Sequence, residues 1–166
     1  SRTADVPCYT AAKAVMLMKR MLIIVLVALL VASTGCVPSV LRSDQGNVEV
    51  TAPRRNDTVT FTQQTDGSWY ADVNAQGKAR AFEAGVNWEA FQQLSSDTLV
   101  DLGSGYFMAD GGAPDFGPFD TNLHLVSSAE NPAPKGEGII RIFLTSMKDG
   151  SQLDIVDVKV KLTTAP

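Results

Sequence analysis

The stretch IIRIFLTSMKDGSQLDIVDVKVKL, residues 139–162, decides the fold because its pattern is that of a β-hairpin. Two runs rich in β-branched residues, 139–145 and 153–162, flank the turn-forming sequence Lys148-Asp149-Gly150. Apolar and polar residues alternate along most of the second run, a period typical of a strand with one buried face. The stretch therefore predicts two antiparallel strands joined by a tight loop.

The length of this loop sets which residues face each other. A two-residue turn at Asp149-Gly150 would place Val158 opposite Arg141. A three-residue loop, 148–150, would place Val158 opposite Ile140 and would collect aliphatic side chains on one face. It would also put Gly150 in the left-handed position of a type I turn with a G1 bulge, where glycine is favoured. We expect this second register.

The start of the second strand has a different parity. Leu153 and Ile155 fall out of step with Val156 and Val158, which predicts a β-bulge there. Beyond the bulge, we expect the aliphatic residues of both strands to face one core, namely Ile140, Ile142, Val156, Val158 and Val160.

The period of two recurs along the rest of the chain, at 48–51, 58–62, 69–73, 82–86 and 122–125. Gly, Pro and Asp-rich turns separate these segments. Short strands at this spacing predict an all-β domain, an antiparallel β-sandwich of immunoglobulin-like or similar type.

One segment, NWEAFQQLS at 87–95, departs from this pattern. Asn87 can cap a helix, and Trp88, Phe91 and Leu94 recur at helical spacing. We expect one short helix or a connection here.

The N-terminal third is unlike the rest. The apolar run MLIIVLVALLVA at 21–32 follows Lys19 and Arg20 and precedes a small-residue segment. These are the three parts of an export signal, and the run is shorter than the about 20 residues needed to span a bilayer. Met18 and Met16 each offer a start, and with Met18 we interpret 18–35 as a signal peptide and 1–17 as upstream sequence outside the protein.

The sequence Ser-Thr-Gly-Cys at 33–36 resembles the lipobox of bacterial lipoproteins, which typically reads Leu-Ala-Gly-Cys. The resemblance covers residues 18–36; Gly35 and Cys36 match its strongest positions, and Ser33 departs from the common leucine. It implies that Cys36 takes a diacylglycerol, that the chain is cut before it, and that its amine receives a further acyl chain such as palmitate. Two or more acyl chains give a stable membrane anchor, since each buried CH₂ contributes about 0.8 kcal/mol.

Such an anchor places the protein in the cell envelope. Val37 follows the cysteine, where an aspartate would resemble an inner-membrane retention signal. This favours the outer membrane in a source that has one, with the domain facing the periplasm or the cell surface.

The mature chain, 36–166, has ten lysines and arginines against 17 aspartates and glutamates, a net charge of −7. This acidic balance argues against nucleic acid as a partner. Cys36 is its only cysteine, so no intramolecular disulfide can form. We expect a tether at 36–46 and a β-sandwich at 47–166, which is long enough to fold without a disulfide.

Catalytic residues are scarce. His124 is the only histidine and alternates with Leu123 and Leu125, so we expect it to point into solvent. One histidine cannot build a zinc site without other ligands. The segment 103–105 (Gly-Ser-Gly) lacks the strand-turn-helix pattern of a nucleophile elbow. We predict that the protein is not an enzyme and needs no cofactor.

The segment ADGGAPDFGPFD, 109–120, is the most unusual. Asp110, Asp115 and Asp120 are weak candidates for calcium ligands, although their spacing does not match an EF-hand. The favoured interpretation is an acidic surface loop, because Asp, Gly and Pro are the usual turn residues. Phe116 and Phe119 should pin this loop to the core.

Two pairs of adjacent aromatics, Trp69-Tyr70 and Tyr106-Phe107, stand in strands, so one of each pair should point outward. Outward aromatics could stack on sugars or pack a partner, but they more often cover sandwich edges. The sequence therefore predicts a lipid-anchored binding or scaffolding module whose partner is another envelope protein or polymer. The alternative is an envelope protein that binds a small molecule or calcium through 109–120.

Overall fold

The computed structural model describes residues 39–166. The predicted signal peptide and Cys36 lie outside the described residues. Within the described part, the chain forms nine strands and one short 3₁₀ turn, and no helix there is long and apolar enough to cross a membrane. The elements in chain order are β1 (Leu41–Arg42), β2 (Val48–Ala52), β3 (Thr58–Gln63), β4 (Trp69–Ala79), η1 (Phe82–Ala84), β5 (Gly85–Gln93), β6 (Leu99–Met108), β7 (Gly117–Ser127), β8 (Gly136–Thr145) and β9 (Gln152–Thr164).

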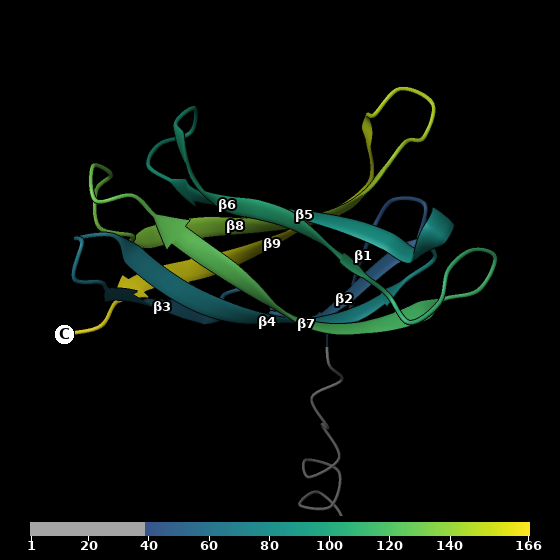
Figure 1. Cartoon of the computed structure of the whole chain (residues 1–166), viewed down its shortest axis with the longest axis horizontal. Helices are drawn as coiled ribbons and strands as arrows, with labels where there is room; N and C mark the ends of the chain where they lie inside the picture. The colour runs from purple at the N-terminus through teal and green to yellow at the C-terminus, as the bar shows by residue number, and fades with distance from the viewer. Residues whose placement is uncertain (1–38) are drawn as a thin grey trace, which may run out of the picture. The chain divides into compact units, whose positions relative to one another are not determined.

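The strands form two layers that face each other (Figure 1). The first sheet has the order β1-β2-β4-β7, and the second has the order β9-β8-β5-β6. Strand β3 joins them along one edge, because it pairs antiparallel with the start of β4 and parallel with the end of β9. The expected all-β sandwich is confirmed.

The core lies between the two sheets and follows from the period of two. On β4, the buried side chains alternate with exposed polar ones. The same alternation runs along β7 and β9, so each sheet presents one apolar face to the other. The largest fully buried apolar side chains include Phe61, Leu102, Leu123, Leu125, Ile140 and Ile142.

The C-terminal hairpin has the expected register. Ile140 faces Val158 and Ile142 faces Val156. All of these side chains are buried, as is Val160. Gly150 has a φ of +72°, the left-handed conformation expected for it.

The loop of this hairpin, however, is not the predicted three residues. The N–H of Ser146 donates to the carbonyl of Ser151 (2.9 Å), and that of Gly150 donates to Ser146 (2.9 Å), so the loop comprises 147–150. The pairing next to the loop is therefore one residue out of step with the pairing of Ile140 and Val158. The bulge at the start of β9, where Asp154 has a φ of +50°, restores the register.

The predicted helix at 87–95 is wrong, because most of this segment belongs to β5. Strand β5 lies between β6 and β8 and pairs with both. Its buried side chains are Val86, Trp88, Ala90 and Gln92, which alternate with partly exposed ones. Two flanking strands supply hydrogen bonds to the β5 backbone, and this tertiary context overrides the helical spacing of its aromatics.

Two boundaries also differ from expectation. The segment 82–86 is not a strand throughout: η1 occupies its first three residues, and the Phe82 side chain is 64% exposed. Part of the predicted tether belongs to the domain, because Leu41 pairs with Val50 as strand β1 and Ser43 is buried.

Candidate functional site

A cleft of about 710 Å³ opens at one end of the sandwich. We call it the end cleft. Three connections line it: the β1–β2 turn, η1 with the start of β5, and the β8–β9 loop. The last strand residue of β6 and the first residues of β9 complete its walls. The cleft therefore joins parts of the chain that are up to about a hundred residues apart.

The rim of the end cleft is apolar and exposed. Phe82, Met108 and Met147 are 64%, 59% and 76% exposed, and Leu153 is 39% exposed. Grouped apolar exposure of this kind marks interaction surfaces. The two methionines add adaptability, since an unbranched thioether side chain can repack against different partners.

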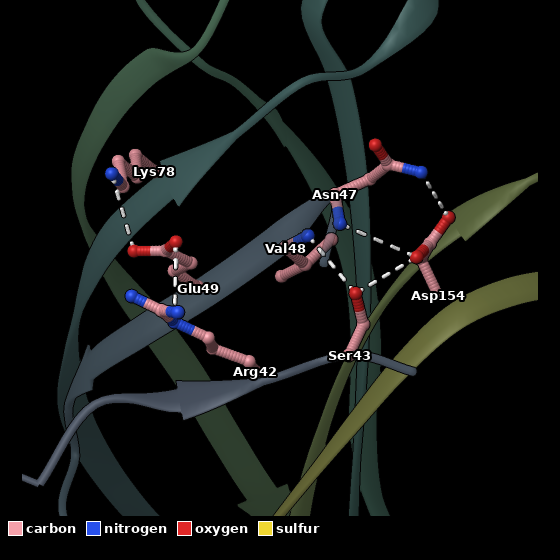
Figure 2. A network of polar contacts seen from close by, with 7 residues as sticks. All are labelled: Arg42, Ser43, Asn47, Val48, Glu49, Lys78 and Asp154. Carbon is pink, nitrogen blue, oxygen red and sulfur yellow. Dashed lines mark hydrogen bonds and ion pairs between the residues drawn. The ribbon is translucent and has the colours of Figure 1, made fainter. Parts of the chain in front are cut away.

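A buried carboxylate, that of Asp154, lines the cleft, and Figure 2 shows the network of polar contacts around it. Asp154 accepts hydrogen bonds from the Ser43 hydroxyl (2.8 Å) and the Asn47 side-chain amide (2.9 Å). The Ser43 oxygen in turn accepts the N–H of Val48 (3.1 Å). Because a buried carboxylate needs such donors, the network holds the β1–β2 turn against the bulge of β9.

Backbone strain gathers at the same place. Glu83, Ala84 and Asp154 have φ values of +52°, +60° and +50°. Glu83 and Asp154 line the cleft, and Ala84 lies in sequence between Glu83 and Gly85, which also lines it. Non-glycine residues rarely adopt this conformation, and such residues concentrate at functional sites.

A second polar cluster lies beside the Asp154 network in Figure 2 and belongs to the edge of the first sheet. Glu49 pairs with Arg42 (3.3 Å) on β1 and Lys78 (3.2 Å) on β4. Lys78 also lies over the ring of Phe116, 4.9 Å from its centroid. These contacts pin the short β1 strand and the 109–116 segment to the sheet edge.

The outer face of β4 and β7 carries a different kind of surface. Tyr70 donates its phenol hydrogen to Asp72, and the Nδ1 of His124 also bonds to this carboxylate. The bond from Tyr70 and then that from His124 lower the pKa of Asp72 below its ordinary value. The same bond to Asp72 raises the pKa of Tyr70. His124 is exposed, as expected, but it belongs to a network.

Of the three aspartates considered as calcium ligands, Asp120 lies on β7 and accepts hydrogen bonds from the amides of Asn74 (2.7 Å) and Gln76 (3.1 Å). Asp110 and Asp115 lie in the exposed loop before β7. Among residues 39–166, no group of three or more His, Cys, Asp or Glu side chains is placed to hold a metal ion. The structure does not bring the three aspartates together as a ligand set.

The aromatics divide between core and surface. Phe119 is buried against Phe107, with 4.9 Å between ring centroids, so its predicted pinning role is confirmed. Phe116 is 36% exposed and is held by cations rather than by the core. Tyr106 points outward and is 75% exposed.

The end cleft was not predicted from the sequence. Asp154 and Ser43 are 111 residues apart, and a single aspartate in an alternating run carries no sign of its partner. The only local hint was the parity break at Leu153 and Ile155, which marks the bulge.

The comparisons with known proteins agree with this fold. The family model described as immunoglobulin-like domain of bacterial spore germination matches residues 47–151. No curated protein matches the chain significantly. The match covers more than half of the chain and all but the first and last strands of the sandwich, so this chain belongs to the family of immunoglobulin-like domains of bacterial spore germination.

Proposed function

We propose that this protein is a lipid-anchored module of the cell envelope that binds another envelope protein through the end cleft. The observation that carries the proposal is the cleft itself, with its exposed apolar rim at Phe82, Met108 and Met147. The family description, which refers to bacterial spore germination, supports a role in the envelope.

The anchor rests on the sequence at 18–36. If Cys36 carries the lipid, only residues 37–40 separate it from β1, which starts at Leu41. Five Cα steps of at most about 3.6 Å span about 18 Å. The domain would therefore stay next to the bilayer surface, and its partner would be a membrane-proximal protein.

The polar groups of the cleft favour binding over catalysis. Asp154 is 9% exposed, and the bonds from Ser43 and Asn47 already engage both of its oxygens. The Asn47 side-chain oxygen accepts hydrogen bonds from the guanidinium of Arg80 at 3.0 and 2.7 Å. These groups hold the shape of the cleft, and the exposed apolar side chains supply the contact. The expected occupant is an apolar segment of a partner protein.

The binding part of the proposal can be tested by site-specific photocrosslinking in the native envelope. A photoreactive residue at Met147 or Phe82 should capture a defined protein. The matched control is Leu99, which is 50% exposed and does not line the cleft. Capture of the same protein with equal yield from Leu99 would contradict binding at the cleft.

The anchor has its own test. Mass spectrometry of the mature protein should find its N-terminal residue to be Cys36 carrying a diacylglycerol. Cys36→Ala should abolish this modification and leave an uncut precursor. An unmodified N-terminus at any other residue would refute the anchor while leaving the cleft untested, so the two parts of the proposal fail separately.

A further inference from the structure

A notch interrupts the first sheet beside β4. Strand β3 pairs with β4 at Trp69 and Tyr70, and β2 pairs with it from Gln76 to Ala79. Between these positions, the register of the described chain gives β4 a partner on one side only, β7. A hollow of about 310 Å³ opens there. This hollow, which we call the notch, shares no lining residue with the end cleft.

The notch is lined by hydrogen-bonding groups of several kinds. Asp72 and Asn74 line it on β4, Thr58 and Thr60 line it on β3, and Asp57 lines it in the preceding loop. The backbone edge of β4 adds further donors and acceptors, because neither β2 nor β3 pairs with it at 71–75. Such a set suits a ligand with many hydroxyl groups better than an apolar one.

Two of these side chains are already oriented. The bonds from Tyr70 and His124 both reach Oδ1 of Asp72, so Oδ2 remains available to a ligand. Asn74 donates one N–H to Asp120 (2.7 Å), which fixes the plane of its amide and leaves its oxygen and second N–H. Preoriented planar carboxylates and amides reduce the entropy lost when a ligand binds.

A flat aromatic platform adjoins the notch. The rings of Tyr70 and His124 are stacked, with centroids 6.2 Å apart and planes inclined by 20°. Both contact the same Asp72 carboxylate. A sugar ring has an apolar C–H face that packs on aromatic rings and equatorial hydroxyls that bond to planar carboxylates and amides.

We propose that the notch, together with the Tyr70–His124 platform, binds an uncharged oligosaccharide. Asp57, Asp72 and Asp120 give this surface negative charge, which repels anionic glycans and phosphate-rich polymers. The site is independent of the end cleft, so one domain would contact a glycan through its sheet face and a protein through its end.

The test is calorimetric titration of the full mature lipoprotein in detergent with three probes: chitohexaose, cellohexaose and oligogalacturonate. Saturable binding of at least one uncharged probe is expected, with no saturable binding of the anionic one. Absence of binding by both uncharged probes, or tighter binding of oligogalacturonate, would overturn the proposal.

Variants assign the site. Tyr70→Ala and Asp72→Ala should each weaken binding about tenfold or more, since each removes a direct contact. Tyr106→Ala is the matched control, because Tyr106 is 75% exposed on β6 of the other sheet and should leave affinity unchanged. Equal loss from Tyr106→Ala would overturn the assignment.

Melting curves of each variant check that it folds. Asp72→Asn keeps one acceptor oxygen and should therefore retain more affinity than Asp72→Ala.

Discussion

The body of the C-terminal hairpin and its loop end are held in place by different interactions. The body of β8 and β9 alternates regularly, and its buried face packs on the opposite sheet. The end near the loop carries a bulge, a left-handed aspartate and exposed Met147, and it forms a wall of the end cleft. The body therefore stabilises the sandwich through local pattern and burial, whereas the end depends on polar partners far away in sequence.

The largest expected effect lies in the body. Val158 is fully buried, so Val158→Asp places an unpaired charge in the core and should destabilise the domain by about 4–5 kcal/mol or more. This approaches the whole stability of an ordinary domain. Chemical denaturation measures the loss. The control is Ile155→Asp on the same strand. Ile155 is 39% exposed, so this change should cost less than about 1 kcal/mol. Equal losses would contradict the claim that the buried face of the hairpin body stabilises the sandwich.

A smaller effect is expected at the bulge. Asp154→Ala removes the acceptor for Ser43 and Asn47 and leaves their donors without this partner, at a cost of about 2 kcal/mol. Asp154→Asn should cost less, because asparagine tolerates the left-handed backbone and keeps one acceptor. Denaturation midpoints compare the two. If the alanine variant is as stable as the original protein, the network does not hold the cleft wall.

Part of this contrast could be predicted from sequence and part could not. The hairpin register follows from the parity of Ile140, Ile142, Val156 and Val158, because a one-residue slip would expose the whole set. The loop length did not follow: a three-residue loop and a four-residue loop with a bulge give the same pairing of Ile140 with Val158. The local pattern constrains the total number of residues in the loop and the bulge together. It does not show how many of them belong to each.

The same limit applies to β5 and to the candidate sites. Trp88, Phe91 and Leu94 fit a helix as well as they fit a connection, and only pairing with β6 and β8 makes the segment a strand. The end cleft depends on Asp154 meeting the β1–β2 turn, and the aromatic platform depends on β4 pairing with β7. Such long-range pairings are not visible in a single sequence.

At the loop itself, Gly150→Val should destabilise by about 1–2 kcal/mol. A Cβ at Gly150 would meet no atom within 4 Å, so the cost comes only from the left-handed backbone. Gly150→Asn should cost less, because asparagine adopts this conformation more readily. Thermal melts compare the two variants, and an equal cost would mean that the loop adopts another conformation in solution.

The smallest effect concerns the polar face. The lowered pKa of Asp72 means that the folded state favours its ionised form. This contribution to stability is present above the ordinary pKa and is lost as pH falls through the lowered value. Tyr70→Phe removes the principal donor and should raise the Asp72 pKa toward 3.8. A carboxyl titration followed by NMR would show this, and an unchanged midpoint would contradict the role of Tyr70.

The central claim is that the exposed apolar rim at the loop end of the hairpin, with Met147, binds a partner and contributes little to stability. The most direct measurement is retention of the photocrosslinked partner by the detergent-solubilised lipoprotein carrying Met147→Glu, with its melting temperature measured in parallel. Met147 is 76% exposed, so the account predicts loss of the partner with a change in stability below about 0.5 kcal/mol. Full retention of the partner would contradict the account.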